Sequence, residues 1–229
     1  MNDLSIVETI LRNRRRFFIE IREGIGLSEK TRAMLLSSVI FFMLYGAVMG
    51  STHSLWQALS SAVKLPVLFL ATLVICSPTL YFFNVLFGSN QSLTQNFALI
   101  LTAITVTSVL LLSFSPIVLF FLLTTSHYQF FKLLNVGVFA VCGGIGVVFL
   151  NQGMRVVSAG SQEGERARGC VMQFWVVVYA FVGSQMAWTL RPFIGAPSMP
   201  FELFRQLGGN FYANIFASIG EILGFFTVL

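Results

Sequence analysis

Few residues of this chain are of the kinds that do chemistry, and they are scattered along it. His53 and His127 are its two histidines, and Cys76, Cys142 and Cys170 are its three cysteines. Two histidines without carboxylates or thiolates beside them are a weak signal for a metal site, and no CxxC pair occurs. We therefore expect no metal and no other cofactor, with the cysteines packed as small apolar side chains. Whether either histidine binds anything stays open.

Motifs of catalysis are also missing from the sequence. There is no GxSxG, no HExxH and no phosphate-binding glycine loop. Gly143, Gly144 and Gly146 fall inside an apolar run, so they are expected in a helix rather than around a nucleotide. The sequence therefore predicts a protein that is not an enzyme.

Glu221 is the one acid in the apolar C-terminal stretch of the chain. Inside a membrane it would be a costly buried acid and thus a candidate functional residue. On an interfacial helix it would face headgroups or water, and this second interpretation is favoured.

Uncharged polar residues form the remaining candidates. They lie in or near apolar runs, at Asn84, Gln95, Thr102, Thr105 and Asn135. Gln95, Thr102 and Thr105 share one helical face. Such a face lines a polar pathway or hydrogen-bonds to a neighbouring helix, and the second is commoner, at about 1 kcal/mol per bond.

The chain that must position these residues is strongly apolar. Of its 229 residues, 56% are hydrophobic and 10% are charged, against about 25% charged in soluble domains. Uncharged runs cover residues 33–63, 65–131, 133–154 and 169–190, and each reaches the roughly 20 residues of a membrane-spanning helix. We therefore predict an all-α fold, a polytopic integral membrane helix bundle.

Five transmembrane helices are predicted within these runs, at residues 33–50, 65–88, 93–125, 130–150 and 170–190. The third would be about 50 Å long as a straight helix, which exceeds the hydrocarbon thickness. It must tilt, kink or protrude, and Ser113, Ser115 and Pro116 mark the expected irregularity. The alternative is two spans folded at Pro116.

The basic residues decide between these alternatives. Ten of the fourteen Lys and Arg lie in residues 1–32 and 151–169. With five spans both segments share one side, which the positive-inside rule makes cytoplasmic, N-terminus included. A fold at Pro116 would move Arg155, Arg166 and Arg168 outside. Anionic lipid headgroups thus explain the net charge of +5, and no nucleic-acid partner is expected.

The N-terminal segment, residues 1–32, is predicted to form a cytoplasmic amphipathic basic helix at the membrane surface. Its apolar residues at helical spacing are Leu4, Val7, Leu11, Phe18 and Ile21. The candidate membrane-surface binding residues lie between them, at Arg12, Arg14, Arg15 and Arg16. Gly24 and Gly26 are expected to end this helix, and Ser28 to cap the next one.

The C-terminal residues 191–229 follow the bundle of residues 33–190 and begin with a proline-rich extended stretch. Asn210 is expected to cap a final apolar helix over residues 211–226. This helix is expected to lie in the outer interface or to re-enter the membrane, and a sixth span is the alternative.

Small residues recur four positions apart, as at Gly46 and Gly50 and at Ala140 and Gly144. Such spacing lets helices approach closely. Packing within the bundle is the simpler interpretation, and a contact face for another membrane protein is the alternative.

Residues 65–152 resemble a known family. The stretch KLPVLFLATLVICSPTLYFFNVLFG, a polar turn, a long apolar run ending SPIVLFFLLT and then YQFFKLLNV are similar to the bacterial form of the YIP family of Ypt/Rab-interacting membrane proteins. The resemblance implies five spans with a cytoplasmic N-terminus. The ending, with RPFIGAPSMPFELFR and GNFYANIFASIGEILGF, is similar to cyanobacterial members, which implies a bacterial inner membrane or a thylakoid.

These patterns favour a non-catalytic accessory, assembly or scaffold subunit that packs against lipid or a larger membrane complex. Its expected partners are the lipid bilayer and another integral membrane protein, and a homo-oligomer stays open. The alternative is a channel or facilitator with a neutral polar pathway around Asn84, Thr102, Thr105 and Asn135.

Overall fold

The computed structural model describes residues 5–51, 53–86, 91–125, 127–158, 165–195, 200–204 and 209–223. In this part of the chain every regular element is an α-helix, which confirms the all-α prediction. The helices are α1 (Ser5–Arg12), α2 (Arg14–Arg22), α3 (Leu27–Gly50), α4 (Leu55–Leu86), α5 (Leu93–Thr124), α6 (Tyr128–Val157), α7 (Glu165–Thr189) and α8 (Phe211–Ile222).

Five of the described helices, α3 to α7, are long and apolar enough to cross a membrane. The shortest of their apolar stretches is the 21 residues of α7, which as a helix is about 32 Å long and matches the hydrocarbon thickness. The chain is therefore a helical membrane protein with the five predicted spans.

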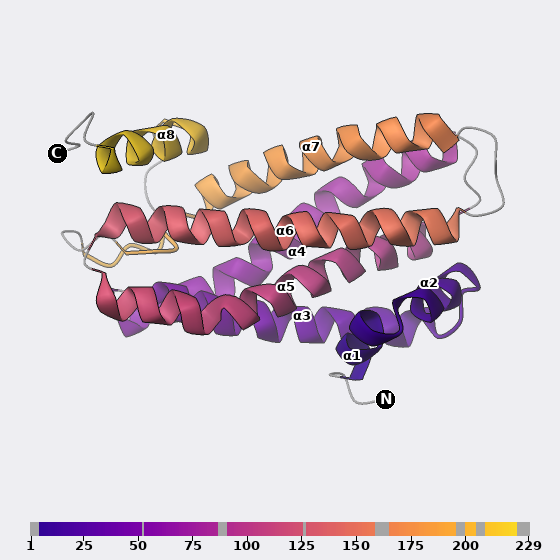
Figure 1. Ribbon diagram of the computed structural model, residues 1–229, viewed down its shortest axis with the longest axis horizontal. Coiled ribbons are helices and arrows are strands. Elements are labelled where there is room, and N and C mark those ends of the chain that lie inside the picture. Colours follow the sequence, from indigo (N-terminus) through magenta and orange to yellow (C-terminus); the bar gives the residue numbers. More distant parts are fainter. Residues whose placement is uncertain are drawn as a thin grey trace.

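The long helices lie side by side, with α5 at the centre against α3, α4 and α6 (Figure 1). α7 packs on α4 at the edge of the bundle, and α8 lies beside the start of α6. The end of the bundle at which α3 finishes is called the far end below.

Glycines and aromatic rings set the closest approach between α3 and α4. A Cβ atom on Gly46 would lie 2.5 Å from the Ser61 carbonyl oxygen, and one on Gly50 would lie 2.5 Å from that of Gln57. Beside them, the rings of Phe42 and Phe69 stack with their centroids 4.2 Å apart. The pair Gly46 and Gly50 therefore serves packing inside the bundle.

The second span is longer than predicted, because α4 begins at Leu55 rather than at residue 65. The polar residues Gln57, Ser61 and Lys64 resemble the end of a membrane span in the sequence. In the structure they hydrogen-bond to the chain after α7. Their polarity marks a tertiary contact, and the helix continues through them.

The third span is a single helix, so the alternative of two spans folded at Pro116 is wrong. The backbone stays helical through Ser113, Ser115 and Pro116, where the sequence predicts an irregularity. Membrane helices tolerate proline because neighbouring helices and local adjustments satisfy the freed carbonyl group. With 32 residues, α5 is about 48 Å long, so it tilts or protrudes beyond the hydrocarbon layer.

The N-terminal segment forms two short helices, α1 and α2, which we call the arm. Asn13 separates them, so the single helix of the prediction is in fact two. Gly24 and Gly26, with φ angles of 74° and 60°, end the arm as predicted. Gly26 is the N-cap of α3, whereas Ser28, the predicted cap, lies inside that helix.

The last three helices also differ from the prediction at their ends. α6 extends beyond the predicted span on both sides, and α7 begins at Glu165, five residues before the predicted span. Asn210 caps α8 as predicted, since its side-chain oxygen accepts a hydrogen bond from the Ala213 amide at 2.7 Å. Residues 159–164 and 224–229 lie outside the described part of the chain.

Candidate functional site

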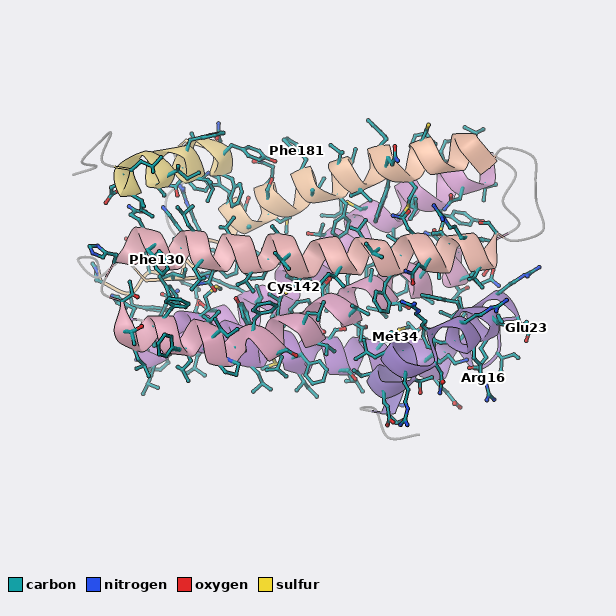
Figure 2. All side chains as sticks on the ribbon, in the orientation of Figure 1. Arg16, Glu23, Met34, Phe130, Cys142 and Phe181 are labelled. Carbon is teal, nitrogen blue, oxygen red and sulfur yellow. The ribbon has the colours of Figure 1, made fainter. Side chains whose placement is uncertain are left out.

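Two threonines of the predicted polar pathway join α5 to α3. Thr105 Oγ1 lies 3.0 Å from Ser38 Oγ, within hydrogen-bonding distance. Thr102 Oγ1 lies 3.4 Å from the sulfur of Met34, which points into the bundle near the arm (Figure 2). Both hydroxyl groups also donate to carbonyl groups of α5 itself. These side chains are buried contacts between helices.

The asparagines of the predicted pathway pair across helices as well. Tyr45 Oη of α3 donates to Asn135 Oδ1 of α6 at 2.9 Å. Asn84 Nδ2 of α4 donates to Asn96 Oδ1 of α5 at 3.3 Å. All four side chains are buried, and a buried polar group in a membrane protein needs such a partner. The contacts favour packing over a polar pathway.

Gln95 does not share the environment of the two threonines. It forms a capping box with Ser92 at the start of α5, with bonds of 3.2 and 2.8 Å between them. Its amide nitrogen then donates to the carbonyl oxygens of Ile21 and Arg22 at 3.2 and 2.8 Å. Gln95 therefore ties the arm to α5.

The bundle, rather than lipid, covers the main apolar face of the arm. The buried side chains of this face are Ile6, Ile10, Phe17, Phe18 and Ile21. Phe18 reaches α6, where a Cβ atom on Gly153 would lie 2.7 Å from its ring. Leu11, which the sequence places on the apolar face, is 47% exposed.

All four candidate arginines of the arm are exposed. Arg12 pairs with Glu8 at 3.1 Å, and Arg16 pairs with Glu20 at 3.0 Å. Glu20 also binds Lys30 of α3 at 2.9 Å. The hydrogen bond from Lys30 lowers the pKa of Glu20, outweighing the desolvation that opposes it, and Arg16 adds to the effect. This carboxylate therefore fastens the arm to the first span.

Glu221 lies at the far end, on the short helix α8. Gln129 Nε2 of α6 donates to its carboxylate at 2.8 Å, and Lys132 Nζ donates to Asn214 Oδ1 at 2.9 Å. α8 runs alongside α6 there (Figure 1). With 12 residues, it is about 18 Å long, too short to cross a bilayer. Glu221 is thus a half-buried anchor between α8 and α6.

Lys64, which comes directly before the predicted second span in the sequence, is a buried cation. The residue is only 5% exposed. The ammonium group donates to the carbonyl oxygen of Pro192 at 3.3 Å and to that of Leu203. It also lies 4.8 Å from the centroid of the Phe204 ring. Lys64 therefore holds the chain segment that follows α7.

Two further residues of α4 bind the same segment. Gln57 Nε2 donates to the Pro192 carbonyl at 2.9 Å, and Ser61 Oγ donates to the Phe193 carbonyl at 2.6 Å. Gln57, Ser61 and Lys64 stand four and three residues apart, which places them on one face of a helix. That spacing is the signal in the sequence by which this cluster could have been found.

The histidines and cysteines do not gather into a metal site in the described part of the chain. There, no three His, Cys, Asp or Glu side chains form a group able to hold a metal ion. His53 packs against Gly195, and His127 is the N-cap of α6. Cys76 and Cys142 are buried, whereas Cys170 is exposed.

The surface of α6 has two sides rich in small residues. Gly146 faces α5, where a Cβ atom would lie 2.8 Å from the Ala103 carbonyl oxygen. Gly137 and Gly144 are exposed, and a Cβ atom on either would meet nothing within 4 Å. Ala140 is also exposed on this outer side. We call Gly137, Ala140 and Gly144 the outer face of α6.

A groove of about 600 Å³ lies between α3 and α4. Its lining is apolar throughout and consists of Val39, Met43, Val63, Pro66, Val67, Leu70, Ala71, Val74 and Ile75. Such a lining suits lipid acyl chains and offers no hydrogen bonds to a polar solute.

Comparisons of the chain with known protein families, with curated proteins and with solved structures each found no match.

Proposed function

We propose that this chain is a non-catalytic accessory subunit whose helix α6 packs against a helix of another integral membrane protein. The observation that carries the proposal is the outer face of α6, where Gly137, Ala140 and Gly144 are exposed and the glycines have open space beside them. In a bilayer, helices associate through close packing, and small residues four apart let two backbones approach. The face is on the side of the helix away from the packed Gly146.

The polar contacts support this function over a channel. Thr102, Thr105, Asn84 and Asn135 each bind another helix or lie in hydrogen-bonding contact with one. A residue that lines a pathway needs its polar group free for the solute. The two asparagines use their amide groups in bonds between helices, and the two threonines donate their hydroxyl protons to carbonyl groups of α5.

We also propose that the chain belongs to the YIP family that it resembles. Its N-terminus would then lie in the cytoplasm, in a bacterial inner membrane or a thylakoid. The five-helix bundle agrees with the architecture that the resemblance implies. The exposed arginines of the arm agree with the positive-inside rule.

Co-purification tests the proposal. After extraction in mild detergent, native electrophoresis and mass spectrometry should show a stoichiometric membrane-protein partner. Gly144→Leu should lose that partner, because the larger side chain fills the space that a second helix would occupy. Ala180→Leu, which enlarges an exposed residue of α7, is the matched control and should retain it. A Gly144→Leu chain that keeps the partner would contradict the proposal.

A flux assay separates this function from the channel. The purified chain in liposomes should pass no polar solute, and Thr102→Val with Thr105→Val should leave that result unchanged. Solute flux that these substitutions alter would establish the pathway instead.

A further inference from the structure

The basic residues of the arm fall into two groups. Arg12 and Arg16 pair with Glu8 and Glu20, so acids compensate their charges. Arg14, Arg15 and Arg22 are exposed and form no ion pair with any residue that the structure describes. Arg14 and Arg15 are also adjacent in the chain, at the start of α2. Two neighbouring arginines there have no acid paired with them in the described part of the chain.

The arm packs at the end of the bundle where α3 begins, and helices that span a membrane end at its surface. α1 is seen nearly end-on in Figure 1, so it lies across the direction of the long helices, as a helix on a membrane surface would. Leu11 and Ile25 are 47% and 54% exposed, which suits insertion among acyl chains at an interface. Figure 2 shows Arg16 at the outer edge of the arm, away from the bundle.

From this placement we infer that Arg14 and Arg15 bind the phosphate groups of anionic phospholipids. A guanidinium group matches a phosphate with two parallel hydrogen bonds, and it is always charged. A zwitterionic headgroup carries its own cation, which competes for the phosphate. An anionic headgroup leaves the phosphate charge for the arginines. The paired residues Arg12 and Arg16 contribute less, because each already holds an acid.

Native mass spectrometry of the purified, delipidated chain tests this assignment with phosphatidylglycerol and phosphatidylcholine. The wild-type chain should bind phosphatidylglycerol more tightly. Each basic residue at a membrane surface changes binding by roughly 5-fold, so Arg14→Gln with Arg15→Gln should weaken it by roughly 25-fold. Arg14→Lys with Arg15→Lys should keep most of the preference, because the charge remains.

Arg12→Gln with Arg16→Gln is the matched control. It removes two exposed arginines of the same arm and the same charge, but each of these residues is already paired with an acid. The control should keep the preference. Equal loss in both double variants, or no headgroup preference in the wild-type chain, would overturn the assignment. Single glutamine variants carry the test if the double variant fails to fold. The assay needs no protein partner, so its result is independent of the outer face of α6.

Discussion

At the scale of single residues, Lys64 shows how this chain accommodates a charge in a membrane helix. Its ammonium group is bound by two carbonyl oxygens and faces an aromatic ring, although no acid pairs with it among the described residues. Carbonyl dipoles and ring faces are the groups that satisfy a desolvated cation when no carboxylate is near. The charge and the segment after α7 therefore stabilise each other.

Replacing Lys64 should loosen that segment. Hydrogen bonds from a charged donor contribute about 1.5–3 kcal/mol, and methionine offers none. Lys64→Met should therefore speed up tryptic cleavage at Arg205 in the detergent-solubilised protein. Lys132→Met removes a lysine whose bond to Asn214 is exposed, and it should leave that rate unchanged. Equal cleavage of Lys64→Met and wild type would show that the ammonium group does not hold the segment.

Glu20 makes the arm sensitive to acid. The hydrogen bond from Lys30 lowers the pKa of Glu20 below its ordinary value of 4.5, so the folded chain binds this proton less readily than the unfolded chain. The stabilisation is complete above the ordinary pKa and is lost as the pH falls through the lowered, folded-state pKa. The unfolding temperature in detergent should therefore drop below pH 4.5.

Glu20→Gln isolates this contribution from those of the other carboxylates. At neutral pH the free energy of unfolding of this variant should be about 1 kcal/mol lower than that of the wild-type chain, because a charge-assisted hydrogen bond becomes a neutral one. Its unfolding temperature should fall less steeply in acid than that of the wild-type chain. Parallel curves for the two proteins would mean that Glu20 does not fasten the arm.

At the scale of helices, glycines decide which faces of the bundle are closed. A Cβ atom on Gly46 would lie 2.5 Å from a backbone oxygen of α4, and backbone cannot move aside as a flexible side chain can. Gly46→Ala should therefore destabilise the protein by about 1–3 kcal/mol. Gly137→Ala makes the same change where nothing lies within 4 Å, and it should be neutral or slightly stabilising because alanine favours helices. Unfolding temperatures in detergent compare the two, and equal losses would contradict the packing.

The five spans could be predicted because length and apolarity are local properties of the sequence. The prediction misses the start of α4, although the spacing of Gln57, Ser61 and Lys64 fits one face of a helix, because the carbonyl groups that bind these polar side chains lie far along the chain. The prediction also misses the division of the arm into two helices. An amphipathic pattern predicts a helix, yet it does not say that the bundle, and not lipid, covers the apolar face.

The same limit applies to the candidate polar residues. Their positions in or near membrane helices could be predicted, but each partner lies on another element. Tyr45 and Asn135 belong to helices far apart in the sequence, and Gln95 turns to the arm because it caps α5. Gln95, Thr102 and Thr105 do lie at helical spacing on α5, but the three side chains serve different contacts.

At the scale of the whole molecule, polarity and charge are divided between the interior and the ends. Buried amides and hydroxyls join the helices, for example at Asn84, Asn135 and Thr105. Large apolar side chains such as Phe174 and Val177, at 62% and 66% exposure, cover the outside. Exposed arginines gather on the arm at one end, while α8 and the Lys64 cluster occupy the other. Such a molecule presents lipid or another protein with helix faces, and holds itself together with hydrogen bonds.

Five crossings require that the arm and the segment after α7 lie on opposite sides of the membrane. Asn13 and Phe201 are exposed reporters of these two places, and the Asn13 side chain makes no capping bond that a substitution would break. In a Cys170→Ser background, Asn13→Cys and Phe201→Cys should react with an impermeant maleimide from opposite sides of sealed vesicles. Cys76 and Cys142 are buried and should stay silent. Labelling of both positions from one side would mean an even number of crossings, and one of the five long helices would then have to lie outside the bilayer.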